Sequence, residues 1–351
     1  MTIPTTSKAL VVAEVGKPLS LITDHPVPKP GPDQVLLKVT VAGINPHDQK
    51  TRDDGLFTAD GLPALVTNDV TGTVVALGPG VTKYQIGDRV LSHPGFSTAY
   101  SQNGSQEYAV NDIGAGFQIP DSITDDEAAT LPTNIIAPLV GLFDDKNGVG
   151  IPAPWTDAAK SFDYKGTVLL ILGGGSNCGK FAVQLAKLAG IGTIITVGGP
   201  EQELKSYGAT HVLDRHGGYE AVLERVRKVV GDDLIYAFDA INVPADQILG
   251  LNALSSSKKG KVARLLPLGP VDETKVVGKK AGFELIDVFG SSQARPALAY
   301  PFWEHVPAYL TSGKIKPLSF TVKQGLTAEN ANSVLDAYRD GKRVQKTHIH
   351  V

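Results

Sequence analysis

The stretch from Thr167 to Gly190 constrains the fold more than any other part of this chain. It begins with an uninterrupted apolar run, Val168 to Leu172, which is typical of a strand buried on both faces in a parallel sheet. Glycines follow, and then apolar residues recur at helical spacing. A strand, a glycine turn and a helix in this order direct backbone N–H groups and a helix N-terminus at a phosphate. We expect phosphate contacts from Gly174, Gly175, Ser176, Asn177, Cys178, Gly179 and Lys180.

These glycines are expected because a Cβ would hold a pyrophosphate away from the backbone. The order Gly-Gly-Gly-Ser-Asn-Cys-Gly does not match G-x-G-x-x-G, so a tight turn in another kind of α/β protein stays an alternative. A second strand, Thr193 to Val197, completes a βαβ unit of the expected size. Strands and helices then alternate as far as Phe289, which predicts a doubly wound α/β sheet of about six parallel strands.

The part of the chain before Asp121 has a different texture, because short strands alternate with glycine turns. That pattern indicates a compact, mostly β domain. A helix from Pro301 to Ser312 is expected to bring the chain back to this domain. We therefore predict a β-rich catalytic domain from residues 1–131 and 300–351, and a dinucleotide-binding domain from residues 132–299.

Composition excludes several classes of protein. A net charge of −3 gives no electrostatic reason to expect nucleic acid as a partner. Cys178 is the only cysteine, which excludes a disulfide framework and a zinc site with several cysteine ligands. The chain has no apolar run of the roughly 18 residues that span a membrane, and its start lacks the apolar core of a signal peptide. The expectation is a cytoplasmic protein with no metal and no membrane contact.

Several segments, in the same order along the chain, resemble the medium-chain dehydrogenase/reductase superfamily. They are Gly43–Asp48, Asp69–Val75, Gly78–Val90, Gly104–Tyr108, Ala182–Lys187 and Lys205–Ala209. The segment from Asn45 to Lys50 is similar to the zinc-free branch that contains fungal trans-acting enoyl reductases and quinone oxidoreductases. The resemblance implies a Rossmann-type nucleotide domain and a GroES-like, β-rich catalytic domain.

The chain departs from this family at several functional positions. Zinc-dependent members carry Gly-His-Glu where this chain has Thr67, Asn68 and Asp69, so zinc chemistry of that kind is excluded by ligand supply. Ser176 and Asn177 replace glycines that are common in quinone reductases, and their hydroxyl and amide could bond a phosphate directly. A threonine near the nicotinamide is replaced by Ala137, and a proton-donating tyrosine is replaced by Phe57. The identity of the acid is therefore open.

The end of the second strand indicates which cofactor is bound. NAD enzymes usually place an acidic residue there to bond the ribose 2′-hydroxyl, and this chain has Gly198. Arg215 follows the next strand, where its guanidinium suits a 2′-phosphate. These observations favour NADP(H), although Gly198 could serve only the turn and Glu201 could reach a ribose. Further cofactor contacts are expected from His47, Asp48, Gly199, Leu266, Pro267, Val288, Phe289 and Arg343, with Lys346 closing over the phosphates beside Arg343.

Lys50 is the predicted catalytic residue, since reduction of an activated double bond places charge on an oxygen that a cation can stabilise. The alternative is that Lys50 only holds a cofactor phosphate or a loop. Asp48 is expected to hold this loop in place rather than to transfer protons. His47 and His93 are possible proton donors. The substrate cleft is expected to be lined by Asn134, Ala137 and Phe289.

The predicted function is an NADPH-dependent, zinc-independent reductase that transfers hydride to an activated C=C bond. A polyketide intermediate is one candidate substrate, either as a small molecule or bound to an acyl carrier. Two alternatives stay open: a quinone or aldehyde reductase of the same fold, and a catalytically inactive NADP-binding regulator. The protein is expected to be a monomer or a homodimer.

Overall fold

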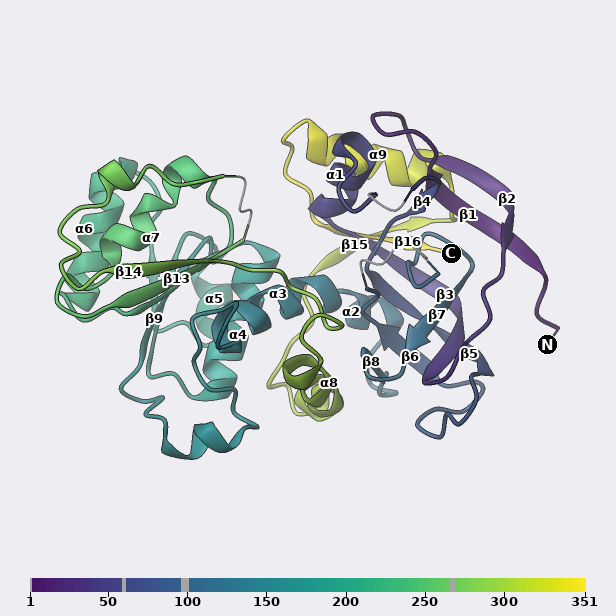
Figure 1. Ribbon diagram of the computed structural model, residues 1–351, viewed down its shortest axis with the longest axis horizontal. Helices are drawn as coiled ribbons and strands as arrows, with labels where there is room; N and C mark the ends of the chain where they lie inside the picture. The colour runs from purple at the N-terminus through teal and green to yellow at the C-terminus, as the bar shows by residue number, and fades with distance from the viewer. Residues whose placement is uncertain (1, 59–60, 96–100, 266–268) are drawn as a thin grey trace. The chain divides into compact units, whose positions relative to one another are not determined.

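The computed structural model describes residues 2–58, 61–95, 101–265 and 269–351 (Figure 1). The chain divides into two compact units. The first unit contains residues Met1–Thr133, Ser291–Gly313 and Pro317–Val351, and the second contains Asn134–Gly290 and Lys314–Lys316. Among the described residues, no helix has both the length and the apolar character that crossing a membrane requires.

The second unit is built on a six-stranded parallel sheet, which confirms the predicted doubly wound architecture. The strand order is β11-β10-β9-β12-β13-β14. The order reverses between β9 and β12, and ligands of such sheets bind outside the carboxyl ends of the strands at that point. The strands are β9 (Val168–Leu172), β10 (Thr193–Val197), β11 (His211–Leu213), β12 (Tyr236–Asp239), β13 (Gly260–Arg264) and β14 (Phe283–Asp287).

Helices cover both faces of this sheet (Figure 1). They are α3 (Pro132–Phe143), α4 (Asn177–Ala189), α5 (Glu201–Tyr207), α6 (Gly218–Val230) and α7 (Ile248–Ala253). Helix α4 contacts α5, and α6 contacts α7. The apolar stripe of α6 consists of Val222, Val226 and Val230, which recur every fourth residue and are buried against Leu170 and Ile195 of the sheet.

The first unit is mostly β, as predicted. A three-stranded sheet has the order β2-β1-β4, and a seven-stranded sheet has the order β15-β16-β3-β5-β6-β8, with β7 also paired to β3. The strands are β1 (Thr6–Val12), β2 (Ser20–Pro26), β3 (Gln34–Ile44), β4 (Ala64–Leu65), β5 (Asp69–Leu77), β6 (Arg89–Ser92), β7 (Tyr108–Asp112), β8 (Gly116–Gln118), β15 (Phe320–Gln324) and β16 (Lys346–His350). The helices are α1 (Pro46–Asp54), α2 (Asp125–Ala129), α8 (Pro296–Thr311) and α9 (Ala328–Arg339).

The long strand β3 positions the polar centre of this unit. It pairs with β5 on one side and with the C-terminal strand β16 on the other, and α1 begins directly after it. Helix α8 begins at Pro296, five residues before the predicted start, because proline fits the first turn of a helix, where no N–H bond is lost. Because β3 pairs with both β5 and β16, the N-terminal part of the chain and the C-terminal strand meet around the end of β3.

Candidate active site

The predicted phosphate loop joins β9 to α4 at the carboxyl end of the sheet, next to the point where the strand order reverses. Helix α4 begins at Asn177, with Ser176 as its N-cap. The loop therefore ends at the N-terminus of a helix of 13 residues, whose first N–H groups have no partner inside the helix. This placement agrees with a role in binding a pyrophosphate.

The structure shows a reason for the glycines of the loop other than the predicted approach of a pyrophosphate, because a Cβ at these positions would meet other atoms of the protein. A Cβ on Gly174 would lie 2.7 Å from Thr196 Cβ, and a Cβ on Gly175 would lie 2.8 Å from Gly199 Cα. A Cβ on Gly179 would lie 2.2 Å from the carbonyl oxygen of Gly173. These Cβ directions point at the protein's own atoms, so Gly174 and Gly175 let the loop pack against the end of β10, and Gly179 lets the start of α4 pack against the loop.

The hydroxyl of Ser176, which the sequence suggested as a phosphate ligand, is engaged in hydrogen bonds within the loop. Its Oγ donates to the carbonyl oxygen of Gly173 at 2.8 Å and accepts the N–H of Gly179 at 3.0 Å. The single hydroxyl proton is therefore used within the loop, and the side chain caps α4. The amide of Asn177 has no hydrogen bond within the described part of the chain and stays a predicted phosphate ligand.

The other side chains of the loop point to different neighbours. Cys178 is partly buried in the first turn of α4. Lys180 forms an ion pair with Glu203 of α5 at 2.8 Å, so its ammonium is already partly neutralised. The cofactor contact of Lys180 stays a prediction.

Arg215 lies against Gly198 at the carboxyl end of β10. Gly198 has a φ of +77°, and a Cβ built on it would be 3.1 Å from Arg215 Cδ. The guanidinium of Arg215 is exposed and makes no ion pair or hydrogen bond with the described residues. Glu201, the alternative ribose ligand, is paired with Lys205 at 2.6 Å. Among the described residues, this strand end therefore has an unpaired cation, and the acid Glu201 is already paired.

Charged residues that the sequence interpretation did not select end the next three strands. Asp239, Arg264 and Asp287 stand side by side in the register of β12, β13 and β14. Arg264 Nε donates to Asp287 at 2.5 Å, and burial raises the pKa of Asp239, which accepts the N–H of Asn242 at 2.9 Å. In the sequence, these three positions could have been recognised because each is a charged residue at or near the end of a predicted strand.

The predicted substrate-lining residues lie on α3 and on the segment after β14, and these two segments touch. A Cβ on Gly290 would lie 2.7 Å from Ala137 Cα, and Val288 approaches α3 at Gly141. Asn134 is buried on the same helix, while Phe289 is 44% exposed. The predicted contacts Leu266 and Pro267 lie outside the described residues.

In the first unit, Asp48 holds the start of α1. Its two carboxylate oxygens accept the backbone N–H groups of Asn45 at 2.7 Å and Thr67 at 2.8 Å. The side chain is buried, and burial raises the pKa of Asp48. Asp48 therefore ties α1 to the segment before β5, and its cofactor contact stays a prediction.

Lys346 is also buried, which contradicts the expectation that it closes over phosphates. Its ammonium forms an ion pair with Asp69 and donates to Asn45 Oδ1 at 3.0 Å. Burial alone would raise the pKa of Asp69, but the Lys346 ammonium and hydrogen bonds hold that pKa below its usual value. Arg343 is exposed and has no ion pair with the described residues, so its predicted role is left open.

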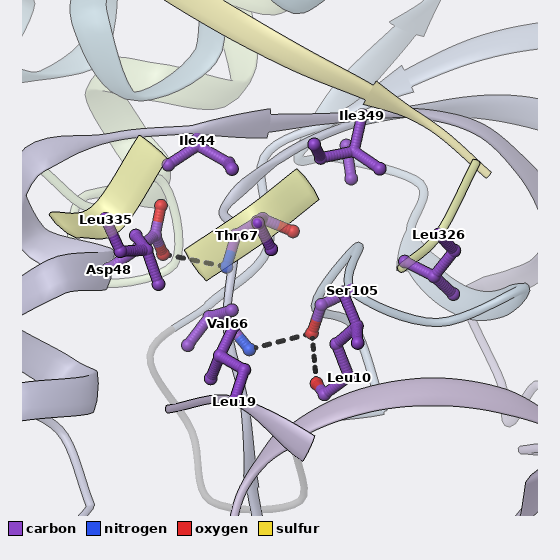
Figure 2. A pocket seen from close by; sticks show the side chains of 12 residues that line it. Leu10, Leu19, Ile44, Asp48, Val66, Thr67, Ser105, Leu326, Leu335 and Ile349 are labelled. Carbon is purple, nitrogen blue, oxygen red and sulfur yellow. Dashed lines mark hydrogen bonds between the residues drawn. The ribbon is translucent and has the colours of Figure 1, made fainter. Parts of the chain in front are cut away.

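A cavity behind Asp48 is too small for a substrate (Figure 2). Its volume is about 10 Å³, room for at most one water molecule. Most of its wall is apolar, with Asp48, Thr67 and Ser105 as the polar contributors. Thr67 has a φ of +73°, which is strained for a β-branched residue, and its Oγ1 makes no hydrogen bond with the described residues. The cavity is therefore a packing feature of the core behind the site.

His47, Asn68 and His93 form a polar centre near the start of β5. His47 Nε2 lies 3.0 Å from Asn68 Oδ1, and Asn68 Nδ2 lies 3.2 Å from the carbonyl oxygen of Pro94. His93 is fully buried, and its Nδ1 lies 2.8 Å from Ser292 Oγ. Burial lowers the pKa of His93 to about 4, so that its imidazole is neutral at pH 7.

Lys50 follows His47 on α1, one helical turn further along. Its side chain is half-buried, and its ammonium has no ion pair or hydrogen bond with the described residues. The helix is anchored by Arg52, which pairs with Asp53 at 2.6 Å and with Asp336 of α9 at 2.9 Å. An anchored helix therefore carries a lysine whose ammonium has no charged partner among the described residues.

Comparison with known proteins agrees with this architecture. Residues 31–139 match the alcohol dehydrogenase GroES-like domain, and residues 178–294 match the family described as zinc-binding dehydrogenase. The dehydrogenase orsE of Emericella nidulans is 32% identical over 341 residues, which cover 93% of this chain and 94% of that protein. The chain belongs to the medium-chain dehydrogenase/reductase superfamily. Membership identifies the protein as an oxidoreductase.

Two further proteins of this superfamily are informative. The trans-enoyl reductase tazE of Aspergillus terreus is 31% identical over 244 residues, which cover 66% of this chain and 75% of that protein. A mycobacterial protein solved in complex with NADPH superposes with a TM-score of 0.71 at 22% identity, covering 98% of this chain and 99% of that one. The structural likeness confirms the superfamily fold, with its Rossmann-type and GroES-like parts.

Proposed function

We propose that this oxidoreductase is an NADPH-dependent, zinc-independent reductase that transfers hydride to an activated C=C bond of an enoyl or enone substrate. The observation that carries the proposal is the state of Asn68. It occupies the position of a histidine ligand in zinc-dependent relatives, and its amide is engaged by His47 and by the carbonyl oxygens of Pro94 and Gly95. The described residues also contain no group of three or more His, Cys, Asp or Glu side chains that could hold a metal ion.

Without a metal, the protein needs another charge to polarise its substrate. Hydride addition to the β-carbon of a conjugated double bond moves negative charge to the carbonyl oxygen. Lys50, whose ammonium has no partner among the described residues, can stabilise that charge. A bound nicotinamide cofactor supplies the hydride, and the protein supplies position and polarity.

The preference for NADPH rests on the pair formed by Gly198 and Arg215. Gly198 leaves room at the carboxyl end of β10, and the guanidinium of Arg215 is unpaired among the described residues. A guanidinium binds phosphate oxygens through charge-assisted hydrogen bonds. The similarity in fold to the mycobacterial protein solved with NADPH supports the same choice.

The similarity to the trans-enoyl reductase tazE supports an enoyl substrate, with an acyl-carrier-bound polyketide intermediate as the candidate. We assign catalysis to residues 1–131 and 300–351 and cofactor binding to residues 132–299. NADPH oxidation should be followed with an enoyl thioester, an enone, a quinone and an aldehyde. Turnover of the first two supports the proposal. Turnover of a quinone or an aldehyde alone supports the alternative reductases, and NADPH binding without any turnover supports a regulatory protein.

A further inference from the structure

The loop of residues 214–217 follows β11 and carries Arg215, the cation that we assign to the 2′-phosphate of NADPH. The side chain of Arg215 is exposed, and its stem lies along Gly198. Its Cδ, Cβ and Cγ are 3.1, 3.5 and 3.7 Å from the position that a Cβ on Gly198 would occupy. Because an exposed arginine has many rotamers, its charge contributes most to binding when the loop already holds it in place.

The backbone on both sides of Arg215 is held by Arg225 of helix α6, which contacts β11. The Nη1 atom of Arg225 donates to the carbonyl oxygen of Asp214 at 2.9 Å and to that of His216 at 2.5 Å. Arg225 is half-buried, and hydrogen bonds from a guanidinium are stronger than those from a neutral donor. One nitrogen therefore fixes the carbonyl groups before and after Arg215.

Two glycines bring the loop over Arg225. Gly217 is the N-cap of α6 with a φ of +98°, and Gly218 follows with a φ of +84°. A Cβ on Gly217 would lie 3.3 Å from Nη2 of Arg225 and 3.3 Å from Cβ of Ala221. The bare backbone at Gly217 therefore lets the guanidinium of Arg225 reach the carbonyl groups of the loop.

The carboxylate next to Arg215 is engaged by another residue of the loop. Asp214 Oδ1 accepts the backbone N–H of His216 at 3.1 Å and lies 2.6 Å from Nδ1 of the same residue. Arg215 has no ion pair with the described residues. The loop therefore keeps its own acid on His216 and leaves the guanidinium of Arg215 available for a ligand.

We propose that Arg225 is a positioning residue that sets the choice of cofactor, because it holds the loop in the form that presents Arg215 beside Gly198. The inference rests on the proposed function, in which Arg215 binds the 2′-phosphate. NADH lacks that phosphate, so the ordered loop favours NADPH over NADH. Arg225 acts through Arg215, since its Nη1 is already used by the two carbonyl groups.

The test is a set of fluorescence titrations with NADPH and NADH. Arg225→Met keeps the apolar stem but has no donor, so the Kd for NADPH should rise about tenfold while the Kd for NADH stays the same. Arg225→Lys has an ammonium that can donate to both carbonyl groups, and it should retain most of the preference for NADPH. Lys228→Met is the matched control, because it removes an exposed cation from the same helix and should change neither Kd. Arg225→Gln, whose side chain is two bonds shorter, is the second variant if Arg225→Met does not fold.

A double-mutant cycle separates positioning from a direct effect of the charge. If Arg225 acts through Arg215, adding Arg225→Met to Arg215→Gln should raise the Kd for NADPH no further. An undiminished effect in that background, equal weakening of NADPH and NADH, or unchanged binding in Arg225→Met would each overturn this inference alone. Wild-type protein with equal affinity for the two cofactors would overturn the NADPH preference as well. Tighter binding of NADPH without turnover of any enoyl thioester or enone would overturn the proposed reaction and not the role of Arg225.

Discussion

Lys346 and Asp69 form a buried ion pair across 277 residues of sequence. The pair ties the C-terminal strand β16 to the first residue of β5, beside Asn45 at the start of α1. Gly43 makes it possible, since a Cβ there would lie 2.9 Å from Lys346 Nζ and 2.8 Å from Asp69 Cβ. The helix that carries His47 and Lys50 therefore depends on a contact made by the end of the chain.

Lys346→Met should destabilise the first unit strongly. Removing the ammonium leaves the buried carboxylate of Asp69 without its partner, which costs about 3–5 kcal/mol. The double variant Lys346→Met/Asp69→Asn should recover part of that loss. Urea unfolding measures the difference, with Lys342→Met as the control because Lys342 is 68% exposed and pairs only at the surface. Equal stability of Lys346→Met and Lys342→Met would contradict a structural role for the ion pair between Lys346 and Asp69.

Arg215→Gln should weaken NADPH binding and leave NADH binding unchanged. The variant loses charge-assisted hydrogen bonds to the 2′-phosphate that are worth roughly 1.5–3 kcal/mol, or about ten- to hundredfold in Kd. Fluorescence titration with both cofactors is the measurement. The matched control is Lys205→Gln, an exposed cation on α5 that already pairs with Glu201. Arg215→Gln is a cleaner test than Gly198→Asp, because an aspartate at the positive φ of Gly198 would also add backbone strain. Equal wild-type affinities for NADPH and NADH would refute the assignment.

Gly175→Ala should lower both stability and cofactor affinity. Its Cβ would meet Gly199 Cα at 2.8 Å, so the loop or the end of β10 must move. Asn177→Ala should instead weaken NADPH binding with little change in melting temperature, because its amide has no partner among the described residues. Thermal unfolding and titration of both variants separate packing from direct contact. An unchanged melting temperature for Gly175→Ala would show that the glycine serves only the ligand.

Acid should destabilise the protein partly through His93. Its pKa is about 4 in the folded protein and about 6.5 when unfolded, so the unfolded chain binds more protons between these values. Stability is therefore lost as the pH falls from 7 to 4, by roughly 3 kcal/mol for this group. His93→Gln should lack this part of the pH dependence, whereas replacement of the exposed His211 should keep it. Urea unfolding at pH 7 and pH 5 decides between these outcomes.

Local pattern was sufficient to predict the doubly wound sheet, because most of its strands are short apolar runs followed by a turn and a helix. It also selected Gly198 and Arg215, which follow neighbouring strands of one sheet and therefore meet. It failed where a side chain's partner comes from a distant segment. Lys346 was expected on phosphates, yet its partner Asp69 is fixed by the pairing of β16 with β3 and of β3 with β5.

The glycine loop shows a second limit of sequence reasoning. Glycines before a helix indicate a close approach of the backbone, but the sequence does not say to what. In the structure Gly174 and Gly175 approach Thr196 and Gly199, whose positions depend on how β10 pairs with β9. The hydrogen-bond partners of Asn68, which are His47, Pro94 and Gly95, are likewise brought together only by the fold.

In the proposed reaction, hydride passes from NADPH to the β-carbon of an activated double bond without a metal. The most direct measurement uses NADPH deuterated at C4, with both C4 positions labelled, and the crotonyl thioester of N-acetylcysteamine, after treatment of the protein with EDTA. We expect butyryl thioester with one deuterium at the β-carbon, formed at the same rate as before chelation. Deuterium on a carbonyl carbon of an aldehyde control alone, or activity that disappears with EDTA and returns with zinc, would contradict it.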